Sequence, residues 1–235
     1  MVVYLKNQRD RSMKGILFFG APGSGKGTQT HLLSGRLHIP VIGMGQLLRR
    51  EVTQETPLGK KIAPVLEKGQ HLDTMDVMSI LKSQLTQCPG EWVLLDGVPR
   101  SLEQAQAVEH YAFDKPLTIV AVIYLQISPK KVAERIQSRS SCAHCHKDYC
   151  HTISMCSVCG STEFSKRLDD TEAIVLKRLE VFHEGIADIL DFYKKKGVLC
   201  VIQGDQEIEH VYADIVECLT SLMKTVGLPT TEDEA

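Results

Sequence analysis

Gly20-Ala-Pro-Gly-Ser-Gly-Lys-Gly-Thr28 follows a short apolar run, Gly15–Gly20, and opens a stretch with helical spacing, Thr28–Leu37. Glycines let the backbone curl so that successive N–H groups face one anion, and the following helix adds its dipole. Lys26 would reach the terminal phosphates. The common pattern has Ser or Thr directly after this lysine, whereas here Gly27 intervenes and Thr28 supplies a hydroxyl near Mg²⁺. A plain strand-to-helix turn is the alternative, but lysine, hydroxyl and context together favour a phosphate-binding loop.

Strand-like and helix-like segments alternate along the rest of the chain. We expect buried strands at 92–95, 117–125 and 198–202, and one more that includes Val41 and Ile42. Helices are expected at 73–87, 101–110, 128–139, 170–195 and 207–224. This alternation predicts an α/β P-loop fold of three layers, in which helices cover both faces of a five-stranded parallel sheet.

Two stretches interrupt the alternation and are interpreted as inserts. Residues 43–72 are helical in pattern, and residues 138–170 are rich in Cys, His, Ser and Asp. The core is then expected to comprise 1–42, 73–137 and 171–235, with flexible ends at 1–13 and 227–235.

The composition excludes several classes of protein. The 235 residues are 43% apolar and 24% charged, with a net charge of −2, which argues against a disordered chain and a bulk nucleic-acid binder. No apolar run approaches the ~18 residues that span a bilayer, and the start resembles no secretory signal. We therefore expect a cytoplasmic protein without nucleic-acid or membrane partners.

Asp96 closes the strand-like run Trp92–Leu95. An acid after a strand is often a turn residue. In a protein with a phosphate-binding loop, however, it commonly holds Mg²⁺ directly or through water. We expect Thr28 and Asp96 to serve the magnesium ion in this way.

Five of the eight cysteines lie between 142 and 159. Cys142-Ala-His-Cys145 and Cys156-Ser-Val-Cys159 form two knuckles separated by ten residues, a pattern that predicts a structural Zn²⁺ site. Alternative ligands remain, namely Cys150, His144, His146 and His151. The remaining cysteines, 88, 200 and 218, are interpreted as small buried apolar residues.

Four motifs together resemble the adenylate kinase family. They are the phosphate loop continued by Gln29, then Leu95-Asp-Gly-Val-Pro-Arg100 with Gln104, then Arg135-Ile-Gln-Ser-Arg139, and finally Arg167-Leu-Asp-Asp170 with Lys177-Arg178-Leu179. Their order and spacing match over about 14–220. The resemblance identifies 43–72 as the insert that binds the acceptor nucleotide and 138–170 as a long lid, in which some members carry a zinc-binding cysteine quartet.

The resemblance also implies roles for individual residues. Residues at the transferred phosphates would be Lys26, Arg100, Arg139, Arg167 and Arg178. ATP would contact Gly23, Ser24, Gly25, Lys26, Gly27, Thr28, Arg135, Arg139 and Tyr149, with Arg135 against the base. AMP would contact Met44, Arg49, Gln70, His71, Leu72, Gly97, Val98, Pro99, Arg100, Gln104, Arg167 and Arg178, with Arg49 at its phosphate. The implied reaction is Mg²⁺-dependent transfer from ATP to AMP by a monomer, giving two ADP for adenine nucleotide homeostasis.

The acceptor and donor bases stay open. Gly43-Met44-Gly45-Gln46 stands where the family usually has Ser-Thr-Gly-Asp, Val98 replaces a Phe and Gln203 replaces an Asp. The Gln104 amide could pair with adenine or, flipped, with guanine. The alternatives are GMP, UMP or CMP as acceptor and GTP as donor. A P-loop switch or a zinc-knuckle nucleic-acid adaptor is remote, because Tyr149 is the only aromatic residue between the knuckles.

Overall fold

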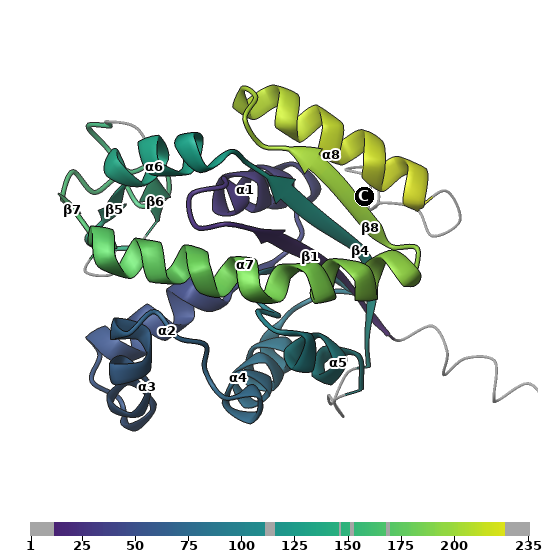
Figure 1. The fold of residues 1–235 in the computed structure, drawn as a ribbon, viewed down its shortest axis with the longest axis horizontal. Coiled ribbons are helices and arrows are strands. Elements are labelled where there is room, and N and C mark those ends of the chain that lie inside the picture. Colours follow the sequence, from purple (N-terminus) through teal and green to yellow (C-terminus); the bar gives the residue numbers. More distant parts are fainter. Residues whose placement is uncertain (1–11, 111–115, 146, 151–152, 168–169, 224–235) are drawn as a thin grey trace, which may run out of the picture.

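A computed structural model describes residues 12–110, 116–145, 147–150, 153–167 and 170–223 (Figure 1). The strands are β1 (Met13–Gly20), β2 (Val41–Gly43), β3 (Trp92–Asp96), β4 (Leu117–Gln126), β5 (Ser140–Cys142), β6 (Asp148–Tyr149), β7 (Phe164–Ser165) and β8 (Leu199–Gln203). The helices are α1 (Lys26–Leu37), α2 (Met44–Thr53), α3 (Pro57–Glu67), α4 (Thr74–Gln87), α5 (Leu102–His110), α6 (Pro129–Gln137), α7 (Glu172–Lys195) and α8 (Ile208–Leu222).

The predicted five-stranded parallel sheet is confirmed, with the order β2-β3-β1-β4-β8. Helices α1 and α8 cover one face, and α4, α5 and α7 cover the other (Figure 1). Because successive side chains of a strand point to opposite faces, Ile16 and Phe18 of β1 pack toward α1 and α8, whereas Leu17 and Phe19 pack toward α4, α5 and α7. The continuous apolar run in β1 follows from burial on both faces.

The carboxyl ends of the parallel strands bring two predicted features together. β1 ends at Gly20, where the glycine-rich loop begins, and its neighbour β3 ends at Asp96. Asp96 pairs in register with Phe18, two residues before the end of β1. The predicted phosphate loop and the predicted magnesium carboxylate therefore lie at the same edge of the sheet.

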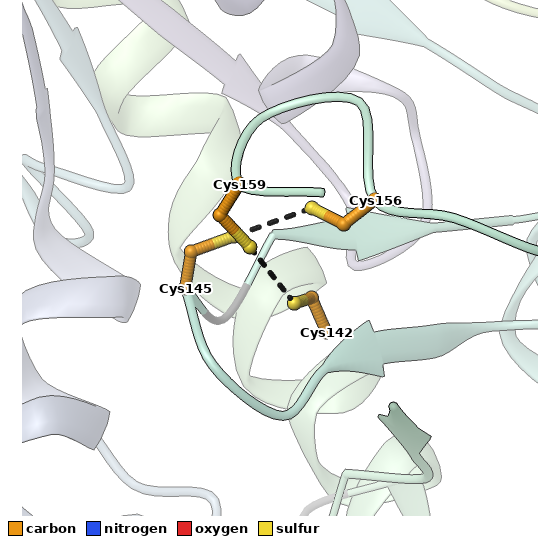
Figure 2. Close-up of side chains that lie close together, drawn as sticks. All are labelled: Cys142, Cys145, Cys156 and Cys159. Atoms are coloured by element: carbon orange, nitrogen blue, oxygen red, sulfur yellow. Dashed lines mark hydrogen bonds between the residues drawn. The ribbon is translucent and has the colours of Figure 1, made fainter. Parts of the chain in front are cut away.

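The segment 138–170 contains a small antiparallel sheet, β6-β5-β7, that the sequence pattern does not indicate. Its strands are two or three residues long, too short for a periodic signal. Beside this sheet the four cysteines of the two knuckles face one another (Figure 2). The division of the chain into a core and two inserts remains a prediction.

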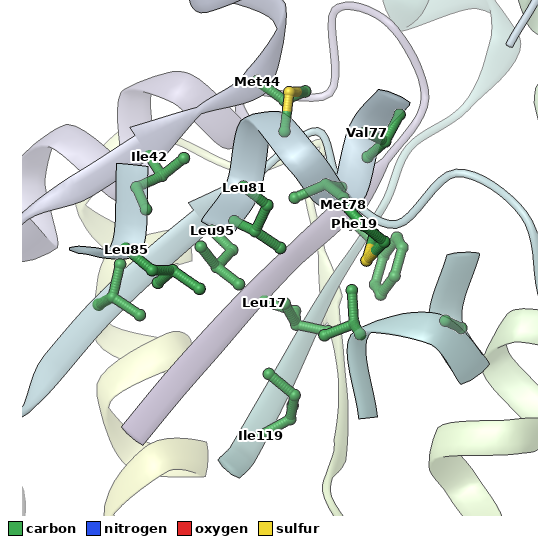
Figure 3. Close-up of a cluster of buried hydrophobic side chains, with 14 of the residues drawn as sticks. Leu17, Phe19, Ile42, Met44, Val77, Met78, Leu81, Leu85, Leu95 and Ile119 are labelled. Atoms are coloured by element: carbon green, nitrogen blue, oxygen red, sulfur yellow. The ribbon is translucent and has the colours of Figure 1, made fainter. Parts of the chain in front are cut away.

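The helical pattern expected for 43–72 is confirmed as α2 and α3, which pack on each other. Thr56 caps α3, since its hydroxyl accepts a hydrogen bond of 2.9 Å from the N–H of Gly59. Met44, at the first position of α2, is buried in the larger core cluster with Val77, Met78 and Leu81 (Figure 3). Burying a side chain of this size contributes about 1.5–3 kcal/mol.

The interpretation of the isolated cysteines is correct for Cys88, a buried thiol outside any disulfide, and wrong for Cys200 and Cys218. Those two form a disulfide that joins β8 to α8, with their Cα atoms 6.3 Å apart. The prediction of a flexible end at 1–13 extends too far, because Met13 is buried in β1. Residues 1–11 and 227–235 lie outside the described residues. No helix in the described part of the chain is both long and apolar enough to cross a membrane.

Candidate active site

The glycine-rich loop wraps around the start of α1. Gly25 precedes the helix in the left-handed region, with φ 98°, a conformation that disfavours other residues. At Gly20 a Cβ atom would lie 2.4 Å from the Ser24 hydroxyl and 2.8 Å from the Leu125 carbonyl. Glycine is thus required where the loop leaves the strand and where it enters the helix.

Lys26 points into the loop that it follows. Its Nζ donates to the carbonyls of Gly20 and Ala21, at 2.7 and 3.0 Å. Burial of the ammonium lowers its pKa to about 8, and this effect outweighs the nearby Asp96 carboxylate. Burial likewise raises the pKa of Asp96, against the pull of Lys26 and Arg100. The site therefore holds partly desolvated charges that a bound polyanion and a cation would stabilise.

Two carboxylates organise four of the predicted arginines. Asp170 accepts from Arg139 through two hydrogen bonds, one of them 2.7 Å long, and lies 3.6 Å from Arg178. Asp148 lies 3.1 Å from Arg167 and 3.7 Å from Arg49. The side chains of Arg139 and Arg167 are both largely buried. The arginines are thereby concentrated in one place, where anionic ligands find several bidentate donors.

The loop, Asp96 and the arginines line a single cleft of about 300 Å³. Predicted residues that line it are Gly23, Gly25, Lys26, Gly27, Thr28, Arg49, Asp96, Gly97, Arg100, Arg139, Arg167 and Arg178. They come from segments far apart in the sequence. The fold therefore brings together in one cleft residues that the sequence motifs indicate as site residues.

A second cavity, of about 550 Å³, adjoins the other side of the loop. It is lined by the predicted donor residues Ser24, Arg135 and Tyr149. Arg135 donates to the carbonyls of Ser24 and Gly204, at 3.2 and 2.9 Å, so it ties the loop to the end of β8. The cavity lies between the loop, α6, β6 and the residues that follow β8.

Several residues predicted to contact AMP lie elsewhere. Met44, Leu72 and Val98 are buried in the core, and they do not line the described pockets. Gln104 is also buried, and its amide is held by backbone, accepting from the Arg100 N–H at 2.8 Å and donating to the Leu72 carbonyl at 3.2 Å. Gln70 is exposed.

His71 and Pro99 line a small apolar pocket of about 100 Å³ that also touches Arg100 and Arg178. Burial, with the neighbouring Arg100, lowers the pKa of His71. This pocket lies next to the predicted phosphate contacts.

The cysteine quartet is compact. The Sγ atoms of Cys142, Cys145, Cys156 and Cys159 all lie within 4.8 Å of one another, and two Sγ–Sγ distances are 3.5 Å (Figure 2). Tetrahedral zinc with Zn–S bonds of about 2.3 Å needs sulfurs about 3.8 Å apart, so the quartet fits such an ion. Neither Cys150 nor His144 belongs to this group. His146 and His151 lie outside the described residues.

Among the cleft residues that sequence reasoning missed are two charged ones, Lys147 and Asp148. Lys147 donates to the Gly27 carbonyl at 3.3 Å, and Asp148 pairs with arginines as described. Both lie between the cysteine knuckles, and no motif distinguishes them there. Their position becomes evident only when β6 folds back over the loop.

The loop at the carboxyl edge of a parallel sheet, with basic side chains facing it, defines the class of P-loop proteins that transfer phosphoryl groups. The comparisons narrow this class. The family model described as "Adenylate kinase" matches residues 18–198. A protein named adenylate kinase from Caldicellulosiruptor bescii is 37% identical over 87% of this chain and 98% of its own length. One of the same name from Limosilactobacillus fermentum is 34% identical over 88% and 99%. The chain therefore belongs to the adenylate kinase family, and it is a phosphotransferase.

Proposed function

We propose that this protein transfers the terminal phosphoryl group of ATP to AMP, reversibly giving two ADP, and so serves adenine nucleotide homeostasis. The observation that carries the proposal is the shared cleft in which Lys26 and the five arginines 49, 100, 139, 167 and 178 face the glycine-rich loop. Two nucleotides meeting phosphate to phosphate bring several negative charges together. Fixed positive charge at the cleft would stabilise that arrangement.

In the proposed reaction, an oxygen of the acceptor phosphate forms the new bond to the transferred phosphorus. The bond from that phosphorus to the β-phosphate oxygen of ATP breaks, and the electron pair stays on the departing ADP. Lys26 and Arg100 neutralise charge on the transferred group, while Arg49 holds the acceptor phosphate. No general base is required, because a phosphate monoester with a second pKa of about 6 is already ionised at neutral pH.

A magnesium ion fits the proposed site. Thr28 and Asp96 line the same cleft beside the glycine-rich loop, and their hydroxyl and carboxylate oxygens are the kind of ligand that Mg²⁺ prefers. When bound with ATP, the ion would neutralise phosphate charge and align the β- and γ-phosphates. Thr28 and Asp96 would hold it, directly or through water.

The donor and acceptor sites follow from the two cavities. The 550 Å³ cavity would hold the donor adenosine against Arg135, with Tyr149 at its lid side. The acceptor would enter between α2 and the start of α5, where Gly97 and Arg100 lie beside Arg49. The segment 138–170 would close over both nucleotides and exclude water, which otherwise competes as the acceptor.

Zinc is proposed as a structural ion in the cysteine quartet. All four positions of a tetrahedron would be filled by Cys142, Cys145, Cys156 and Cys159, which leaves no open position for substrate. We also propose that the protein is a cytoplasmic monomer whose partners are ATP, AMP and ADP, without nucleic-acid or membrane partners. Size-exclusion chromatography tests the monomer.

A second candidate is the same reaction with GMP, UMP or CMP as acceptor, or GTP as donor. One observation favours keeping it: Met44 is buried and both amide atoms of Gln104 bond to backbone. Neither the Met44 nor the Gln104 side chain is therefore placed to distinguish adenine from the other bases.

The deciding experiment is a coupled assay of ADP formation with each nucleoside monophosphate in turn, with ATP or GTP as donor. We expect the highest kcat/KM for ATP with AMP. A higher kcat/KM for GMP, UMP or CMP would replace the proposal with the second candidate. Met44→Thr adds a test of the base contact. A sharper AMP preference by up to about tenfold would indicate a restored polar contact, whereas a loss of stability alone would indicate a packing role.

A further inference from the structure

Asp148 links two parts of the molecule that are far apart in the sequence. It lies on β6, among the cysteine knuckles, whereas Arg49 lies on α2. Asp148 Oδ2 is 3.7 Å from Arg49 and 3.1 Å from Arg167. All three residues line the cleft that contains the glycine-rich loop. A carboxylate thus points from the lid side toward the guanidinium groups expected to bind phosphate.

Other contacts fix this carboxylate in place. Its second oxygen accepts a hydrogen bond of 2.5 Å from the Ser141 hydroxyl on β5. The neighbouring Lys147 reaches the Gly27 carbonyl of the glycine-rich loop. Burial alone would raise the pKa of Asp148, but Arg167, Arg49 and the Ser141 hydroxyl outweigh it, so the pKa lies below its usual value. Asp148 is therefore a charged, oriented group at neutral pH.

A carboxylate and a phosphate present similar acceptors to a guanidinium group, namely paired anionic oxygens. We propose that Asp148 is a positioning residue that occupies the place of the acceptor phosphate at Arg49 and Arg167 in the nucleotide-free enzyme, and that AMP displaces it. This inference rests on the proposed function, which assigns Arg49 to the acceptor phosphate. Until AMP arrives, the contact holds the lid segment against α2.

The contact has a thermodynamic consequence. The contacts of Asp148 with Arg49 and Arg167 must break before the AMP phosphate binds. The more stable these contacts are, the lower is the apparent affinity of the enzyme for AMP. An unbound Asp148 carboxylate also stands near the incoming phosphate and repels it. Removing the charge therefore tightens AMP binding, while the ATP contacts at Lys26 and the loop are left in place.

The test compares Asp148→Asn with Glu163→Gln. Glu163 is an exposed acid of the same segment that lines none of the described pockets, so its variant changes the net charge equally. For Asp148→Asn we expect the KM for AMP to fall about fivefold, the scale of one partly exposed ion pair. The kcat and the KM for ATP should change less than about twofold. Glu163→Gln should behave as the parent.

An unchanged or raised KM for AMP with a lowered kcat would overturn the proposal, because Asp148 would then orient Arg167 for the reaction. Hydrogen exchange without nucleotide gives a second readout. The peptides that contain β5, β6 and α2 should exchange faster in Asp148→Asn than in the parent and in Glu163→Gln. Equal exchange in all three proteins would also overturn it. A parent enzyme that forms no ADP from AMP would refute the proposed function instead, and the exchange result separates the two cases.

Discussion

Arg139 and Asp170 form a buried, bidentate ion pair that joins the beginning of the cysteine-rich segment to its end. Each side chain is only 6% exposed. Arg178 of α7 lies 3.6 Å from the same carboxylate. The ion pair therefore holds the two ends of the segment 138–170 together at the cleft. Asp170 also brings the positive charges of Arg139 and Arg178 close to each other there.

Replacing Asp170 with Ala should destabilise the nucleotide-free protein. Breaking a buried pair leaves an uncompensated charge, a loss of about 3–5 kcal/mol. Bound nucleotides would give Arg139 a new anionic partner, so ATP and AMP should restore much of the loss. Thermal melting with and without nucleotides measures both effects. The matched control is Asp191→Ala, which removes an exposed pair with Lys195 and should lower stability by at most about 1 kcal/mol. Equal losses in the two variants would contradict the role of Asp170.

Lys26→Ala and Arg100→Ala should each reduce turnover by orders of magnitude while the fold persists. Both side chains line the cleft, and cationic groups of this kind contribute about 10³–10⁵ in rate in related phosphoryl transfers. Steady-state assays of ADP formation measure the loss, and circular dichroism checks the fold. Lys195→Ala is a suitable control, because Lys195 forms an exposed pair with Asp191 and lines none of the described pockets. A folded Lys26 or Arg100 variant with near-normal turnover would refute the assignment of the site.

The pH dependence of the reaction should reflect Lys26. Its pKa of about 8 lies below the usual 10.5, so the free enzyme loses this positive charge as the pH rises through 8. Since kcat/KM reports ionisations of the free enzyme, kcat/KM for ATP should fall above pH 8. The kcat should stay constant to higher pH, because bound phosphates favour the ammonium form.

The Lys26→Arg variant is the control for this pH profile, because arginine keeps its charge over the whole range. Its activity, even if lower, should show no fall near pH 8. The lowered pKa of Lys26 also predicts how the stability of the protein depends on pH. The folded state binds fewer protons than the unfolded state between pH 8 and 10.5, so the contribution of Lys26 to stability rises with pH in that window. A flat kcat/KM profile to pH 9.5 in the parent would contradict this prediction.

Two kinds of feature could be predicted from the sequence: elements with a regular apolar pattern and segments that carry a motif. The apolar runs of β1, β3 and β4 and the glycine-rich loop predict the parallel sheet and the position of the cleft. Strands of two or three residues, such as β6 and β7, carry no period, so the small sheet and the placement of Asp148 become evident only in three dimensions. Met44 shows that a motif position alone does not fix what a side chain contacts. It occupies the position at which the family has a ligand contact, but at the start of α2 its side chain lies in the core.

The Cys200–Cys218 disulfide also has no sequence signature, because one cysteine lies in an apolar strand and the other in a helix. The two are 18 residues apart, and closing a loop of that size stabilises a protein by about 3 kcal/mol in the chain-entropy account. We expect Cys200→Ser and Cys218→Ser to lower the melting temperature of the oxidised protein by similar amounts. Under reducing conditions the parent should melt close to the variants. Cys88→Ser, at a cysteine outside the disulfide, is the control. A parent that melts alike with and without reductant would contradict a Cys200–Cys218 bond in solution.

Removal of zinc should loosen the cysteine-rich segment first. Its own apolar cluster consists of Cys142, Tyr149 and Cys156, with Cys145, Ile153 and Phe164 packed against them. A unit of this size with so small a core requires a metal or disulfides. We expect one Zn²⁺ per chain, and we expect chelation to lower the melting temperature and raise the KM for ATP, because Arg139 and Arg167 flank the segment. The core sheet should stay folded, since its clusters lie on α1, α4, α5, α7 and α8.

Elemental analysis and thermal melting of Cys142→Ser and Cys156→Ser decide the zinc prediction. Both cysteines are buried, so each variant should lose zinc and melt at a lower temperature than the parent. Cys150→Ser is the matched control, because Cys150 lies in the same segment but outside the quartet; it should keep its zinc. If Cys150→Ser lost zinc and Cys142→Ser kept it, the ion would be bound by a different set of ligands. A parent purified without zinc would contradict the prediction.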